Sequence, residues 1–117
     1  MYFRGRALDS GLMTDNLLGK EEFDRILEEN ASSLVVIDFF ATWCGPCKIM
    51  GPKFNKMSNE FTDVIFVKVD VDENEDIVSR FQINVMPTFI FMKGGKQIDS
   101  VEGSMEDQLR QKLSANH

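Results

Sequence analysis

The sequence of 117 residues contains only two cysteines and one histidine. Two cysteines cannot supply the several disulfides that hold small secreted domains together, and both lie in one short motif. Structural zinc is also disfavoured, because such a site needs about four ligands and the chain offers one cysteine pair and His117. We therefore expect a fold that relies on its hydrophobic core, in a reducing, cytoplasmic setting.

Long apolar runs and excess positive charge are absent as well. The longest apolar run, residues 34–37, ends at Asp38 and is far shorter than the ~20 residues that span a bilayer. A formal net charge of −6, without a basic stripe, argues against nucleic-acid or anionic-membrane partners. The length and a hydrophobic content of 43% are typical of one soluble globular domain.

The N-terminal segment differs from the rest of the chain. Residues 1–12 contain no apolar stretch of the length that a secretory signal needs. Met13 offers a natural start. We expect residues 1–12 to be an N-terminal extension or an expression remnant, and residues 13–117 to form the domain.

Both cysteines lie at a predicted junction between a strand and a helix. Residues 34–40 are a nearly continuous apolar run, which is typical of a strand covered on both faces, and residues 44–61 are predicted to form a helix. Helix geometry would place the Cα atoms of Cys44 and Cys47 roughly 5 Å apart, a separation that a disulfide accepts. The pair is therefore suited to reversible oxidation.

Their positions make the two sulfur atoms unequal. Cys44 lies where free helix N–H groups and the positive end of the helix dipole favour a thiolate, whereas Cys47 lies one turn inside. We assign Cys44 as the nucleophile and Cys47 as the resolving thiol, which cleaves the mixed disulfide that Cys44 forms with a substrate. A purely structural disulfide is the alternative, but closing so short a loop constrains the unfolded chain little.

The rest of the pattern alternates helices with strands, which indicates an α/β fold with a mixed sheet and helices on both faces. The predicted helices are 20–29, 44–61, 74–81 and one after 104, and the predicted strands are 34–40, 64–71, 88–92 and 97–102, with a possible further strand at 16–18. The crossover makes strands 34–40 and 64–71 parallel, and residues 93–96 are a hairpin signal. We expect Ile49 and Met105 to face the core and Ser104 to cap the last helix.

The motifs resemble those of the thioredoxin family. They are Trp43-Cys44-Gly45-Pro46-Cys47-Lys48, the preceding Val36-Ile37-Asp38-Phe39 and the distant Met86-Pro87-Thr88-Phe89. The resemblance runs from about Phe23 to Leu113, and the Gly-Pro pair differs from the Gly-His and Pro-Tyr pairs of disulfide isomerase domains and glutaredoxins. It implies the thioredoxin fold and a protein-disulfide reductase.

The same resemblance implies partners. Thioredoxin reductase, which uses NADPH, would re-reduce the protein, so that NADPH acts only indirectly and no cofactor is bound. Oxidised proteins such as peroxiredoxins or ribonucleotide reductase would be its substrates. We expect a monomer.

Asp38 is the most informative residue outside the cysteine pair. A carboxylate within an apolar strand loses hydration, which raises its pKa, and an acid that titrates near neutral pH suits general acid–base work on Cys47. A surface-facing aspartate at a strand edge is the alternative. The resemblance places Lys68 near Asp38, where it would favour the ionised carboxylate, although a solvent-facing lysine fits the strand pattern almost as well.

The resemblance also predicts a substrate-binding surface around Cys44. It implies a cis peptide bond before Pro87 that exposes the Met86 backbone to a substrate strand. The predicted contact residues are Trp43, Gly45, Pro46, Met86, Pro87 and Gly103. Without the family, core packing of Trp43 and Met86 is the alternative.

Two other functions stay open. A disulfide isomerase or oxidase is disfavoured by Gly45 and Pro46 and by the lack of a secretory signal. A redox-independent binding module would hold a partner through the same surface. Such a module tolerates Cys44→Ser, and a reductase does not.

Overall fold

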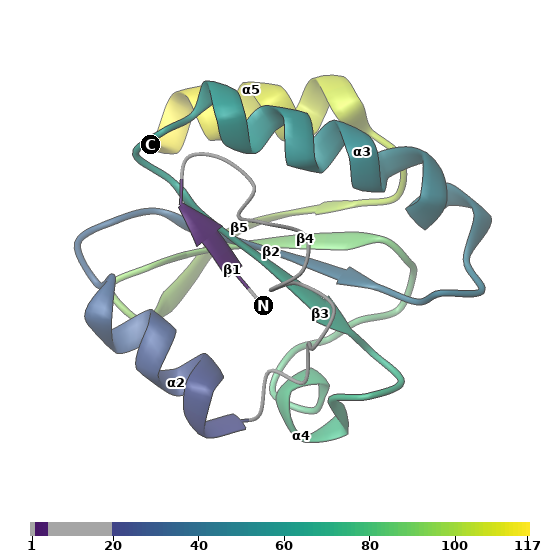
Figure 1. Cartoon of the computed structure of the whole chain (residues 1–117), viewed down its shortest axis with the longest axis horizontal. Coiled ribbons are helices and arrows are strands. Elements are labelled where there is room, and N and C mark those ends of the chain that lie inside the picture. The colour runs from purple at the N-terminus through teal and green to yellow at the C-terminus, as the bar shows by residue number, and fades with distance from the viewer. Residues whose placement is uncertain (1, 5–19) are drawn as a thin grey trace.

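The computed structural model describes residues 2–4 and 20–117. Over these residues strands and helices alternate along the chain (Figure 1), as the sequence predicts. The elements are β1 (Tyr2–Arg4), α2 (Lys20–Glu29), β2 (Val35–Phe40), α3 (Gly45–Glu60), β3 (Ile65–Asp70), α4 (Glu75–Val78), β4 (Thr88–Lys93), β5 (Lys96–Glu102) and α5 (Glu106–Asn116). The predicted α/β class is confirmed.

The described strands form one mixed sheet in the order β1-β3-β2-β4-β5. The central strand β2 pairs in parallel with β3 and antiparallel with β4, and β4 pairs antiparallel with β5, which confirms the predicted crossover and hairpin. β1 pairs antiparallel with β3, a pairing that we did not predict, and the strand expected at 16–18 lies outside the described residues. Because β2 has a neighbour on each side, Asp38 does not lie at a sheet edge.

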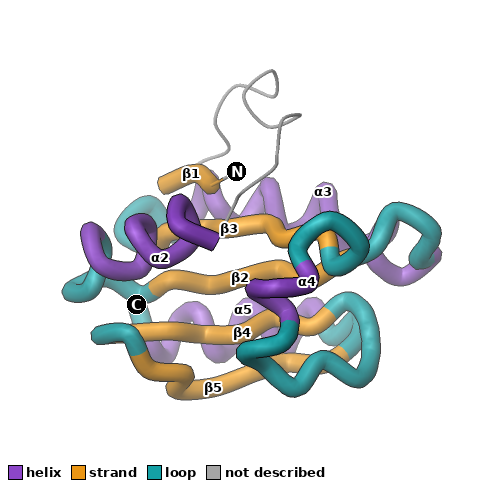
Figure 2. Tube along the Cα trace, turned by 90° about the horizontal axis from the view of Figure 1, so that it is seen from below, coloured by secondary structure: helices purple, strands orange, loops and turns teal. Residues whose placement is uncertain are grey.

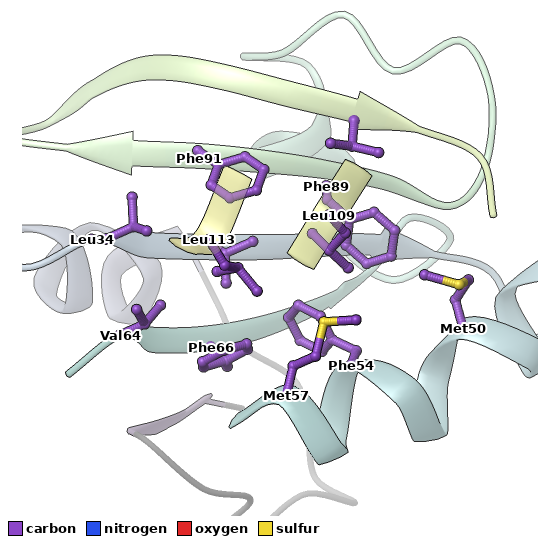
Figure 3. Packing of buried hydrophobic residues seen from close by; sticks show 12 residues of the cluster. Leu34, Met50, Phe54, Met57, Val64, Phe66, Phe89, Phe91, Leu109 and Leu113 are labelled. Atoms are coloured by element: carbon purple, nitrogen blue, oxygen red, sulfur yellow. The ribbon is translucent and has the colours of Figure 1, made fainter. Parts of the chain in front are cut away.

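Helices cover both faces of the sheet, with α3 and α5 on one face and α2 and α4 on the other (Figures 1 and 2). Successive side chains of a strand point to opposite faces, so each buried strand supplies two cores. One core, between the sheet and α3 and α5, contains Val36, Phe54, Phe66 and Phe89 (Figure 3). The other lies on the α2 side and contains Phe23, Ile37, Phe39 and Val67.

The hairpin between β4 and β5 has the turn that its glycines predict. Gly94 and Gly95 adopt φ values of 63° and 78°, the positive region that a two-residue hairpin turn requires. This turn places Glu102, at the end of β5, opposite Thr88 at the start of β4. The residues that follow β5 therefore lie beside Pro87.

Two predicted helix boundaries were wrong. The helix expected at 74–81 ends at Val78, because the N–H groups of Arg80 and Phe81 donate to carbonyls three residues back. The last helix begins after Met105 rather than Ser104, because the Met105 N–H donates to the Gly103 carbonyl in a tight turn.

Ile49 and Met105, which we expected to face the core, are instead 59% and 45% exposed. The buried stripe of α3 runs through Met50, Phe54 and Met57, and Ile49 lies to one side of it. Met105 caps α5 rather than lying within the helix.

Candidate active site

The cysteine pair lies where the chain leaves β2 and enters α3. Cys44 is the N-cap of α3, with extended backbone angles (φ −88°, ψ 119°), and Cys47 lies in the first turn. The two residues form a disulfide, and their Cα atoms are 5.3 Å apart. The predicted spacing of roughly 5 Å is therefore confirmed, and the helix start itself holds the two sulfurs at bonding range.

The surroundings of the two sulfur atoms differ. The backbone N–H of Cys47 donates to Cys44 Sγ at 3.1 Å, so the Cys44 sulfur occupies the capping position of the helix. Cys44 Sγ also lies 3.6 Å from the carbonyl oxygen of Met86. The helix N–H groups and the positive end of the helix dipole therefore lie at the Cys44 sulfur rather than at that of Cys47.

A second segment faces the disulfide from β4. The Met86–Pro87 peptide bond is cis, as expected, and Pro87 is buried. Met86 is half-buried and packs against the small cluster of Ala41, Cys44 and Cys47. Gly103, at a positive φ of 84°, donates its N–H to the Pro87 carbonyl at 2.8 Å. Three segments distant in sequence thus meet at Cys44.

Trp43 lies at the surface beside the disulfide. It is 67% exposed, so the alternative of core packing is wrong for this residue, and Gly45 and Pro46 next to it are also exposed. Its indole Nε1–H donates to Asp72 Oδ2 at 2.9 Å. The sequence analysis did not predict the contact with Asp72. The only indication in the sequence is that Asp72 lies in an acidic loop after β3, a strand that ends at the same edge of the sheet as β2.

Asp38 is buried in the middle of β2, with 2% exposure, which removes the alternative of a surface-facing aspartate. It pairs in register with Lys68 on the parallel strand β3, so both side chains lie on the face covered by α3. Within the described part of the chain, its Oδ1 atom has no hydrogen-bond partner. Loss of hydration raises the pKa of Asp38 to about 7, although the positive charge of Lys68 opposes this rise.

Lys68 is half-buried rather than freely solvent-facing. Its Nζ lies 5.4 Å from the centre of the Phe40 ring, a cation–π contact. A Cβ atom added to Gly51 of α3 would lie 3.8 Å from the same Nζ, so the ammonium group reaches beneath the helix. The predicted proximity of Lys68 and Asp38 is confirmed by the strand register.

A pocket of about 370 Å³ opens between α3 and the ends of β2 and β3. Its walls include Phe40, Cys47, Asn55 and Lys68. Among the described residues, the Oδ1 atom of Asn55 is buried and has no hydrogen-bond partner, a feature that sequence reasoning did not find. The pocket gives solvent a route to the Cys47 side of the disulfide.

Within residues 2–4 and 20–117 we find neither a metal-binding cluster of side chains nor a membrane-spanning helix. No group of three or more His, Cys, Asp or Glu side chains in this part of the chain could hold a metal ion. His117 instead contacts Asp63 through Nδ1 at 2.7 Å. The helices found in the same residues are too short or too polar to cross a bilayer.

Comparison with known proteins gives consistent matches. The family model described as thioredoxin matches residues 16–115. Thioredoxin-1 of Caenorhabditis elegans is 43% identical over 94 residues, which cover 80% of this chain and 82% of the relative. Thioredoxin of Geodia cydonium is 49% identical over 105 residues, covering 89% of this chain and 99% of the relative.

Solved structures agree with these matches. The X-ray structure of Fasciola hepatica thioredoxin superimposes with a TM-score of 0.83 at 39% identity, covering 86% of this chain and 97% of that chain. Another similar structure concerns the thiol resolving mechanism of yeast mitochondrial 1-Cys peroxiredoxin via glutathione and thioredoxin systems. Its TM-score is 0.75 at 38% identity, with 81% of this chain and 88% of that chain covered.

We predict that the burial of Asp38 makes stability depend on pH. Its folded pKa of about 7 exceeds the unfolded value of 3.8, so the folded state binds the proton more tightly. The stability that the protonated carboxyl group contributes is fully present below about pH 4. It is lost as the pH rises through about 7, and the free energy of unfolding falls by about 4 kcal/mol. Asp38→Asn should abolish this slope in urea unfolding of the oxidised protein and stabilise it at pH 8.

The matched control for this measurement is Asp107→Asn, at an exposed aspartate of α5. This variant should keep the slope of the wild type between pH 4 and 7. A wild type and an Asp38→Asn variant with parallel stability curves would show that the carboxyl group is not destabilised by burial.

We also predict that Asp72 orients Trp43. Asp72→Ala removes the acceptor of the indole N–H, so the only tryptophan should become more mobile. Fluorescence anisotropy of Trp43 should fall. Reduction of a protein disulfide should slow about two- to fivefold, which corresponds to the free energy of one exposed hydrogen bond. Asp76→Ala, which removes the same charge at an exposed position of the adjacent helix α4, is the control. Indistinguishable behaviour of the two variants would count against the role of Asp72.

Proposed function

Because the chain belongs to the thioredoxin family, we propose that its Cys44 is the thiol that attacks substrate disulfides and that Cys47 resolves the mixed disulfide. The chain is a thiol–disulfide oxidoreductase that reduces protein disulfides through this pair. The assignment of roles rests on one observation, that Cys44 Sγ accepts the Cys47 N–H as the N-cap of α3.

The reaction transfers two electrons to the substrate. The Cys44 thiolate attacks one sulfur of the substrate disulfide, a Cys44–substrate disulfide forms, and the other substrate sulfur leaves as a thiolate that takes a proton from solvent. Cys47 then loses its proton and attacks Cys44 Sγ. The Cys44–Cys47 disulfide forms, and the second substrate sulfur leaves and is protonated. The substrate is reduced and the pair is oxidised.

Asp38 is the proposed acceptor of the Cys47 proton. A group with a pKa of about 7 accepts and returns a proton near neutral pH with little energetic cost. The positive charge of Lys68 favours the ionised form of Asp38, the form that acts as a base. A pocket beside this region is lined by both Cys47 and Lys68, the residue in register with Asp38.

The substrate polypeptide is proposed to lie across the exposed surface around Cys44. Trp43, Gly45 and Pro46 form one border of this surface. Met86 and Pro87 form the opposite border, where the backbone of Met86 is available to pair with an extended substrate, and Gly103 admits the substrate because it has no side chain.

Membership of the family implies interaction with thioredoxin reductase and with disulfide-containing proteins in general. We propose that NADPH supplies electrons only through that reductase and that the protein itself binds no cofactor. A peroxiredoxin is a proposed substrate, which the yeast peroxiredoxin system of a similar structure supports, and ribonucleotide reductase is another. We propose a role in cell redox homeostasis and a cytoplasmic location, and the restriction of cysteine to the active pair supports the location.

The test is dithiothreitol-driven reduction of insulin, followed by the turbidity of the released chains. Wild type should accelerate the reaction, and Cys44→Ser and Cys47→Ser should each abolish turnover. Pre-reduced Cys47→Ser, mixed with insulin in the absence of dithiothreitol, should accumulate a mixed disulfide through Cys44, which mass spectrometry detects as the added mass of insulin.

The reverse pattern, with the adduct trapped by Cys44→Ser, would exchange the two roles. Acceleration that survives both substitutions would contradict the redox mechanism. Binding of partners without any acceleration by wild type would favour the redox-independent binding module.

A further inference from the structure

A few large hydrophobic side chains are exposed at the surface. Among the described residues, these side chains are Trp43, Ile49, Val85, Ile98 and Met105. Trp43 precedes Cys44, and Val85 precedes the Met86–Pro87 bond, so both belong to the substrate surface already described. Ile49 and Met105 do not, and neither contributes to the core.

Ile49 and Met105 lie at one junction between α3 and α5. Lys53 Nζ and Glu106 Oε1 are 2.7 Å apart and join the two helices, which run side by side in Figure 1. Ile49 precedes Lys53 by one helical turn on the same face, and Met105 adjoins Glu106. Each of these exposed apolar residues therefore neighbours, along its own segment, one partner of the same ion pair.

This junction continues the surface around Cys44. The Gly103 N–H donates to the Pro87 carbonyl at 2.8 Å, and the Met105 N–H donates to the Gly103 carbonyl at 2.9 Å. Two successive hydrogen bonds thus fix Met105 relative to the cis peptide bond. Ile49 lies two residues beyond Cys47 in α3.

The charge of the surface differs between the two sides of the disulfide. On the Trp43 side, the charged residues that line a hollow are one lysine and four acidic residues, namely Lys20, Asp72, Glu73, Glu75 and Asp76. On the side of α5, Lys53 and Glu106 pair with each other, and the neighbouring Ile49 and Met105 expose apolar side chains. A polypeptide that crosses Cys44 meets an acidic side and an apolar side.

We propose that Ile49 and Met105 form an apolar subsite, the α3–α5 subsite, which binds an aliphatic side chain of the substrate polypeptide near its attacked cysteine. The inference rests on the proposed function, because the occupant is the protein whose disulfide Cys44 attacks. The subsite is a specificity determinant, since it contacts the substrate away from the reacting sulfur atoms. A small disulfide without a polypeptide chain does not reach it.

The experiment compares two synthetic peptides, each with one intramolecular disulfide, that carry either leucine or serine at the positions flanking one cysteine. Wild type should reduce the leucine peptide with a kcat/KM about five- to tenfold higher, through a lower KM, as expected for partial burial of one aliphatic side chain. The Ile49→Ser/Met105→Ser variant should lose this preference. Its reduction of a small aromatic disulfide should equal that of wild type.

Ile98→Ser is the matched control, because Ile98 is an exposed isoleucine on the outer strand β5 and should retain the full preference. Equal thermal midpoints of the variants would show that they are folded. The proposal is wrong if wild type reduces both peptides at equal rates or if the double variant keeps the preference. A wild type that reduces neither the peptides nor the small disulfide would instead contradict the proposed function.

Discussion

A carboxyl group without hydration at the centre of the sheet is the constraint on which the active end of this protein depends. Asp38 lies on the central strand β2 and is covered by α3, so its ionisation costs free energy because the charge is removed from water. Lys68, in register on β3, recovers part of that cost but leaves the pKa near 7. The packing of the surrounding core must offset the rest, so the protein is less stable than it would be without a buried proton acceptor on the strand that leads to the cysteine pair.

The fold holds the segments around Cys44 in fixed positions and gives the two sides of the site different surfaces. The N-terminus of α3 holds Cys44 in the capping position, and the hydrogen bond from Gly103 to Pro87 fixes the opposing segment. Because these segments are anchored by buried strands, the reacting sulfur lies on a rigid support. The two sides of the site then differ in character, with the Trp43–Asp72 hydrogen bond on an acidic side and the α3–α5 subsite on an apolar side.

The sequence predicts those parts of the site that depend on local geometry or on a clear motif. Helix geometry gives the spacing of Cys44 and Cys47, and the apolar run around Asp38 indicates its burial. Contacts between distant segments could not be predicted in this way. The Trp43–Asp72 bond joins residues 29 apart, and the start of α5 is displaced by a turn that depends on Gly103.

The most direct test of this account is a carbon-13 NMR titration of the Asp38 carboxyl group in the oxidised protein, with Asp38→Asn used to assign the resonance. The account predicts a midpoint near pH 7, because the buried group resists ionisation. A midpoint near pH 4, the ordinary value for a hydrated aspartate, would contradict it, since Asp38 would then be fully ionised at neutral pH and too weak a base for the Cys47 thiol.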